Sequence, residues 1–165
     1  MKNRGRTVFL CQGAIIAACY VGLTFVVRIF GLDSGAIQIR LSEMLCVLPM
    51  FTPAAIPGLY IGCLLANLLT GAVWLDVLIG PVATLIGALG TYALRKYKWL
   101  APIPPILSNT LIVPFVLAYG YGIEEAIPLM MLTVGIGEVI SIYACGMLFY
   151  FALRKRAPRI FGNGK

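Results

Sequence analysis

The stretch IPLMMLTVGIGEVISIYACGMLFYFAL, residues 127–153, carries a single charged residue, Glu138, in a run that is otherwise apolar or weakly polar. About 20 such residues are enough for a helix to cross the roughly 30 Å hydrocarbon core of a bilayer. A charge at the centre of such a helix costs about 3 kcal/mol or more, so a retained carboxylate needs an explanation. The stretch therefore predicts a membrane-spanning helix that contains a candidate functional residue.

The rest of the chain has the same character, because 61% of its 165 residues are hydrophobic and only 12% are charged. The predicted spans are approximately 7–29, 41–57, 58–75, 77–95, 103–121 and 127–153. A helix satisfies its own backbone hydrogen bonds in lipid, so we expect these spans to be α-helices. The prediction is an all-α integral membrane protein, a bundle of six transmembrane helices forming a single membrane domain over residues 1–165.

Basic residues are distributed unevenly between the two sides of these spans. Of the 13 lysines and arginines, only Arg28 and Arg40 fall on one side. The other side holds Lys2, Arg4, Arg6, Arg95, Lys96, Lys98, Arg154, Lys155, Arg156, Arg159 and Lys165. By the positive-inside rule the crowded side is cytoplasmic, so both termini are expected inside. This distribution explains the net charge of +7 without a nucleic-acid partner.

Several motifs are missing from the sequence. The chain has no histidine, its five cysteines show no CxxC spacing, and no GxxxxGK[ST] phosphate loop occurs. We therefore expect free, packed thiols, no metal and no bound cofactor. The chain is not expected to be an enzyme.

Glu138 is the leading candidate for ligand contact. It lies ten residues after Pro128, roughly 15 Å below the outer surface at 1.5 Å per residue, and Gly135 and Gly137 leave space beside it. A carboxylate at that depth requires a cation, a hydrogen-bonding ligand or a proton. The alternative is an internal salt bridge or a protonated packing residue.

Two further candidates, Arg40 and Glu43, lie three residues apart at the outer start of the second span. They either pair with each other on one helix face or line the mouth of a cavity. Gln38 adds an amide next to them. The segment 30–38 that leads into them is either a lid or an ordinary connecting loop.

Three more polar residues stand in apolar surroundings. Asn67 and Asn109 are amides that either contact a ligand or hydrogen-bond between helices. Asp76, which follows Trp74, either contacts a ligand or caps the start of the next helix.

The first span carries small residues every fourth position, at Ala14, Ala18 and Gly22. Such a stripe lets another helix approach closely. That helix belongs either to a partner protein or to the same bundle.

Four stretches of this chain resemble one family. They are GAIQIRLSEMLCVLPMFTPAAIPGLYIGCLLANLL (35–69), GPVATLIGALGTYALR (80–95), PPILSNTLIVP (104–114) and VGIGEVIS (134–141). They resemble the QueT family of substrate-binding components of energy-coupling factor transporters. The resemblance implies a six-helix bundle in a bacterial plasma membrane that captures a vitamin-like solute at its outer face. A membrane coupling protein and two cytoplasmic ATPases would then supply the energy, with membrane lipid around the bundle.

The resemblance also implies a substrate, a queuosine precursor with a 7-deazaguanine base. Its N1–H and N2–H donors match one carboxylate, and we expect Glu138 to accept them. Glu43 or Asp76 would face the ammonium of an aminomethylated precursor, and an amide such as Asn67 would donate to O6. Residues that fall on the matching stretches and are inferred to contact the ligand are Gln38, Arg40, Glu43, Asn67, Asn109 and Glu138.

The same resemblance implies a docking role for the small-residue stripe. Ala14 and Ala18 match the AxxxA pattern with which the first helix of such components docks on the coupling protein.

Three other functions stay open. One is a component of the same architecture for another vitamin, such as riboflavin or thiamin. The others are a proton-coupled carrier with Glu138 as its titrating site, and a membrane scaffold without a ligand.

Overall fold

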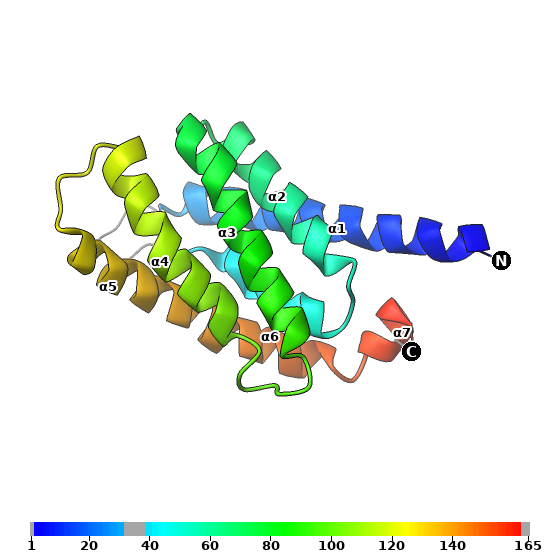
Figure 1. Ribbon diagram of the computed structural model, residues 1–165. Coiled ribbons are helices and arrows are strands. Elements are labelled where there is room, and N and C mark those ends of the chain that lie inside the picture. The colour runs from blue at the N-terminus through cyan, green and yellow to red at the C-terminus, as the bar shows by residue number, and fades with distance from the viewer. Residues whose placement is uncertain (1, 32–38, 163–165) are drawn as a thin grey trace.

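The computed structural model describes residues 2–31 and 39–162, and all regular secondary structure in these two ranges is helical (Figure 1). The predicted all-α class is confirmed for them. Gln38 and most of the proposed lid at 30–38, namely residues 32–38, lie outside the described residues. The elements are α1 (Lys2–Ile29), the 3-10 helix η1 (Leu41–Met50), α2 (Ala55–Leu69), α3 (Trp74–Ala93), α4 (Ile103–Gly120), α5 (Ile127–Glu138), the π-helix η2 (Val139–Cys145), α6 (Gly146–Leu153) and α7 (Ala157–Phe161).

Four helices in the described part of the chain are long and apolar enough to cross a membrane. They are Gly5–Ile29, Trp74–Ala93, Ile103–Gly120 and Ile127–Leu153, the last of which joins α5, η2 and α6 into one rod. Their outward surfaces expose large hydrophobic side chains such as Leu78, Leu111 and Leu148. Such surfaces suit lipid, and the chain is a membrane protein.

The second and third apolar segments are shorter than the others and differ from the expected boundaries. In place of a helix over 41–57 the structure has the ten-residue 3-10 helix η1, and α2 begins at Ala55. Pro49 and Pro53 explain the break, because proline lacks a backbone N–H donor and restricts the residue before it. A 3-10 helix rises about 2.0 Å per residue, so η1 still spans about 20 Å.

The helices form a bundle in which sequence neighbours pack against each other, α1 on α2, α2 on α3, α3 on α4 and α4 on α5. The 3-10 helix η1 is the central element, since it contacts α1, α2, α3, η2 and α6. Figure 1 shows the N- and C-termini at the same end of the molecule, with the first turns of α1 projecting beyond the other helices. The ends of α1 and α4 and the α2–α3 connection lie at the other end.

Helices α1 and α2 approach so closely that only glycine fits between them at two positions. A Cβ atom on Gly58 would lie 2.7 Å from the carbonyl oxygen of Gly13. A Cβ on Gly62 would lie 2.8 Å from Cβ of Tyr20 and 3.0 Å from Cα of Ala17. Close contact between small residues is typical of helix pairs in membranes. The inner face of α1 is thus fixed on α2.

The small-residue stripe predicted on α1 lies on a different face. Ala14, Ala18 and Gly22 are exposed, and a Cβ on Gly22 would meet no atom within 4 Å. Packing within the bundle therefore uses Gly13 and Ala17, and the stripe is left open.

Candidate functional site

A cavity of about 480 Å³ opens at the end of the bundle opposite the termini. Four parts of the chain line it: the last turns of α1, the start of η1, the α2–α3 connection and the segment that follows α4. These parts are far apart in sequence, and the antiparallel bundle brings them together. The cavity falls in the size range of small-molecule sites, about 300–1,000 Å³.

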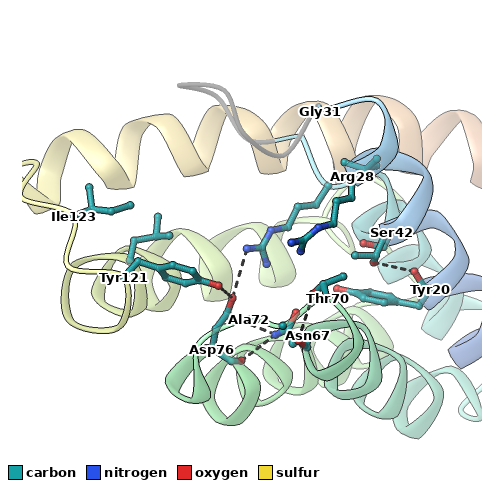
Figure 2. Close-up of a pocket in the computed structure, with 15 residues that line it drawn as sticks. Tyr20, Arg28, Gly31, Ser42, Asn67, Thr70, Ala72, Asp76, Tyr121 and Ile123 are labelled. Carbon is teal, nitrogen blue, oxygen red and sulfur yellow. Dashed lines mark hydrogen bonds and ion pairs between the residues drawn. The ribbon is translucent and has the colours of Figure 1, made fainter.

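Asp76 is the carboxylate that lines this cavity, in the first turn of α3. It is 3% exposed. Nδ2 of Asn67 donates to its backbone oxygen at 3.0 Å and to its Oδ1 at 3.4 Å, and the Tyr121 hydroxyl donates to its Oδ2 at 3.1 Å (Figure 2). A helix N-terminus also favours a negative charge. Asp76 is therefore held as a hydrogen-bond acceptor at the cavity wall.

Gly80, one turn further along α3, leaves the room that this arrangement needs. A Cβ at this position would lie 2.8 Å from Oδ1 of Asp76 and 2.9 Å from Nδ2 of Asn67. Only glycine allows the amide and the carboxylate to meet beside α3. The two sequence candidates Asn67 and Asp76 therefore act as one unit.

Arg40 is the cation of this unit. One of its terminal nitrogens lies 4.0 Å from Oδ2 of Asp76, and its backbone N–H donates to Oγ of Ser141 at 3.2 Å. Burial alone would lower the pKa of Arg40, but the nearby acidic groups, Asp76 first, raise it above its ordinary value. The guanidinium therefore stays charged. Of the two readings of Arg40 and Glu43, the structure shows the cation facing Asp76 and not Glu43.

Glu43 belongs to a second polar cluster, which lies inside the bundle. It is 1% exposed and accepts hydrogen bonds from the Tyr20 hydroxyl, from the Cys46 thiol at 3.1 Å and from Nδ2 of Asn109 at 3.3 Å. All three donors are neutral. Tyr20 also lines the cavity, so its ring stands between the cavity and the buried carboxylate.

Glu138 lies at the end of α5, beside this buried cluster. It is 5% exposed, and its Oε2 has no hydrogen-bond partner among the described residues. Glu138 interacts electrostatically with Glu43 and Arg40 and by hydrogen bonding with the Asn109 amide. It is not one of the residues that line the cavity. The π-helix η2 follows directly, and π-helical turns occur frequently at functional sites.

The seven sequence candidates thus fall into three groups. Arg40, Asn67 and Asp76 line the cavity, and Gln38 lies outside the described residues. The remaining three, Glu43, Asn109 and Glu138, form the buried cluster.

Sequence reasoning missed several polar residues of the cavity wall, namely Tyr20, Thr24, Arg28, Ser42, Thr70 and Tyr121. Arg28 was the easiest of them to predict from the sequence, because it is one of only two basic residues on its side of the predicted spans. Tyr121 gave no such indication. Within the described ranges, no group of three or more His, Cys, Asp or Glu residues is placed to hold a metal ion.

Comparison with known proteins gives two matches. Residues 10–155 match the model of a family described as QueT transporter. A 97-residue stretch is 34% identical to the queuosine precursor transporter QueT of Lactococcus lactis subsp. cremoris (strain MG1363). It covers 58% of this chain and 57% of that relative, so the match spans little more than half of the relative's length. No solved structure matches the chain.

Proposed function

The chain belongs to the QueT transporter family, and from this premise we propose that it captures a queuosine precursor, a 7-deazaguanine base, for import. In this proposal it is a substrate-binding component and not an enzyme. The name of the Lactococcus relative supports the choice of substrate. The cavity supplies the physical argument.

One observation carries the proposal: the cavity presents a carboxylate and a guanidinium side by side, as Asp76 and Arg40. The edge of a guanine-like base has the matching order, with the O6 acceptor next to the N1–H and N2–H donors. Asp76 would accept both N–H groups in a charge-assisted pair, which is stronger than a neutral one. Tyr20 and Tyr121 offer aromatic surfaces for the ring.

The predicted role of Glu138 as acceptor of the same N–H groups stays a prediction. Glu138 is buried and is not among the residues that line the cavity, so a base in the cavity does not touch it in this structure. We therefore assign the role to Asp76 first. Glu43 and Asn109 then support the wall from behind, through the Tyr20 hydroxyl.

We propose that all six apolar segments cross the plasma membrane of a bacterium as a single domain, with both termini in the cytoplasm and the cavity facing outward. The distribution of charge supports this orientation. The basic residues of the α3–α4 connection and of the C-terminal segment lie at the end of the bundle that carries both termini, away from the cavity. Anionic lipid and the positive-inside rule favour that end in the cytoplasm.

The energy for transport would come from partners, a membrane coupling protein and two cytoplasmic ATPases. The sequence has no phosphate loop of its own. The exposed stripe of Ala14, Ala18 and Gly22 supports docking, because it leaves a flat surface of α1 open to another helix.

Calorimetry on the detergent-purified protein tests the substrate. The ligands are the aminomethyl 7-deazaguanine, guanine and riboflavin. We expect binding of the deazaguanine, weaker binding of guanine and none of riboflavin. Binding of riboflavin alone would keep the proposed architecture and overturn the proposed substrate. Uptake that needs a proton gradient and no ATPase partner would favour a carrier.

A further inference from the structure

Arg28 is a cavity residue that neither the sequence motifs nor the proposed function uses. It lies in the last turn of α1 and lines the cavity together with Arg40 and Asp76. Arg40 is within 4.0 Å of Asp76, whereas the Arg28 guanidinium has no hydrogen bond or ion pair within the described ranges. The charged residues known to line the cavity are thus two cations and one anion.

The backbone at Arg28 is held in place, although its guanidinium has no partner among the described residues. Gly31 adopts a φ of +66°, a left-handed conformation that glycine adopts without strain, and its N–H donates to the carbonyl oxygen of Arg28 at 3.1 Å. Helix α1 therefore ends at a defined position beside the cavity. Figure 2 shows the Arg28 side chain extending from this end of α1 toward the cavity.

A guanidinium has five N–H donors and no acceptor, so it needs an acceptor as its partner. Asp76 already receives hydrogen bonds from Asn67 and Tyr121 and faces Arg40. Among the described residues, the Arg28 guanidinium is therefore left without an acceptor, and its N–H donors are available to a ligand in the cavity. In a guanine-like base bound to Asp76 by its N–H donors, the neighbouring acceptor is the carbonyl oxygen O6, whose two lone pairs leave room for Arg28 beside Arg40.

We propose that Arg28 is a specificity-determining residue that donates hydrogen bonds to the carbonyl oxygen of the bound base. This inference rests on the proposed function. It explains how the cavity would distinguish a 6-oxo base from one with an amino group or hydrogen at that position. A 6-amino base would direct donors at a guanidinium, and a base without a 6-substituent would leave the guanidinium unpaired.

The test combines a change in the protein with a change in the ligand. Binding of 7-deazaguanine and of 6-thio-7-deazaguanine, which keeps the N1–H and N2–H donors but replaces O6 with sulfur, a weak acceptor, is measured by calorimetry for the unmodified protein and for Arg28→Gln. A hydrogen bond from a charged group is worth about 1.5–3 kcal/mol, so we expect Arg28→Gln to weaken 7-deazaguanine binding about 10- to 100-fold. Binding of the analogue should change less than about threefold, because its sulfur is a poor acceptor for Arg28.

Two further variants make the result specific. Arg28→Lys keeps the charge but loses the planar fork of donors, so it should recover only part of the affinity. Arg95→Gln removes an exposed cation at the opposite end of the bundle, where its side chain bonds to the carbonyl oxygen of Tyr92, and it should leave binding unchanged. A single symmetric size-exclusion peak for each variant checks that it is folded.

The outcomes separate the two proposals. Equal losses for both bases in Arg28→Gln would show a general charge effect and overturn the inference, as would no loss for either base. In both cases the unmodified protein still binds 7-deazaguanine and the proposed function stands. If the unmodified protein binds neither base, the proposed function fails and the role of Arg28 fails with it.

Discussion

Two carboxylates, Asp76 and Glu43, are almost equally buried, at 3% and 1% exposure, yet their surroundings differ. Asp76 lines an open cavity and faces a cation, Arg40, whose side chain is 28% exposed. Glu43 is enclosed and accepts from three neutral donors. Burial alone therefore does not identify a ligand-binding acid, and the exposure of its partners is the better guide.

The difference has an energetic meaning. Two partners of Asp76 reach solvent, since Tyr121 is 44% exposed and the Arg40 side chain 28% exposed, and partly exposed ion pairs contribute only about 0–1 kcal/mol. A ligand replaces such partners at low cost. The partners of Glu43 are all buried, at no more than 4% exposure, so breaking its contacts leaves buried donors unsatisfied at about 1–3 kcal/mol each. We interpret Asp76 as an acceptor for ligand and Glu43 as a structural anchor.

The largest effect is expected for Glu43→Ala. The change leaves the Tyr20 hydroxyl, the Asn109 amide and the Cys46 thiol without their acceptor, and we expect a loss of about 4 kcal/mol in stability. Thermal unfolding in detergent, followed by size exclusion, measures it. Glu43→Gln is the matched control, because it keeps an acceptor oxygen and should lose less. Equal unfolding temperatures for Glu43→Ala and the unmodified protein would remove the distinction between anchor and acceptor.

Asp76→Asn is expected to affect binding more than stability. The amide keeps the size of the side chain but offers one acceptor oxygen in place of two and no charge. We expect about 100-fold weaker binding of 7-deazaguanine, or about 2.7 kcal/mol. Glu124→Gln, an exposed carboxylate in the connection after α4, is the control and should bind normally. Unchanged affinity in Asp76→Asn would exclude this residue as the acceptor.

Ser141→Ala sharpens the comparison, because Ser141 connects the cavity to the rod that carries Glu138. Its Oγ accepts the backbone N–H of Arg40 at 3.2 Å. Loss of one such bond is worth about 1 kcal/mol, so binding should weaken about fivefold. Ser108→Ala removes a buried hydroxyl that bonds to the carbonyl oxygen of Pro105, and it serves as the control. A loss shared by both variants would indicate a packing effect only.

The smallest effect is expected for Glu138→Gln, which tests the sequence-based assignment directly. Oε2 of Glu138 has no partner within the described ranges, so an amide there breaks no hydrogen bond of that atom. Binding measured by calorimetry should change less than about threefold. If binding is instead lost as strongly as in Asp76→Asn, the buried cluster is part of the substrate site, and Glu138 is the acceptor predicted from sequence.

The sequence allowed the apolar segments to be located well, because continuous hydrophobic runs are a strong local pattern. The last segment, expected at 127–153, is the rod Ile127–Leu153. The η1 segment was harder, since hydrophobicity does not distinguish a 3-10 helix from an α-helix. Pro49 and Pro53 interrupt the helix there, and α2 begins at Ala55 instead of 58.

For the site, the sequence indicated which residues are costly to bury but not which of them meet. Arg40 and Asp76 are 36 positions apart, and their pairing depends on how η1 lies against α3. Tyr121 reaches Asp76 from the end of α4 across 45 positions. Such contacts follow from the packing of the bundle, and local spacing contains no information about them.

Helix α1 connects three parts of the molecule mechanically. Its inner face touches α2 backbone to backbone at Gly58, its open face carries Ala14 and Ala18, and its end supplies Arg28 to the cavity. A force applied to the open face is therefore transmitted along a single rigid rod to the cavity wall, with α2 moving as part of the same body. A partner bound to the open face of α1 would therefore act on the cavity wall without touching it.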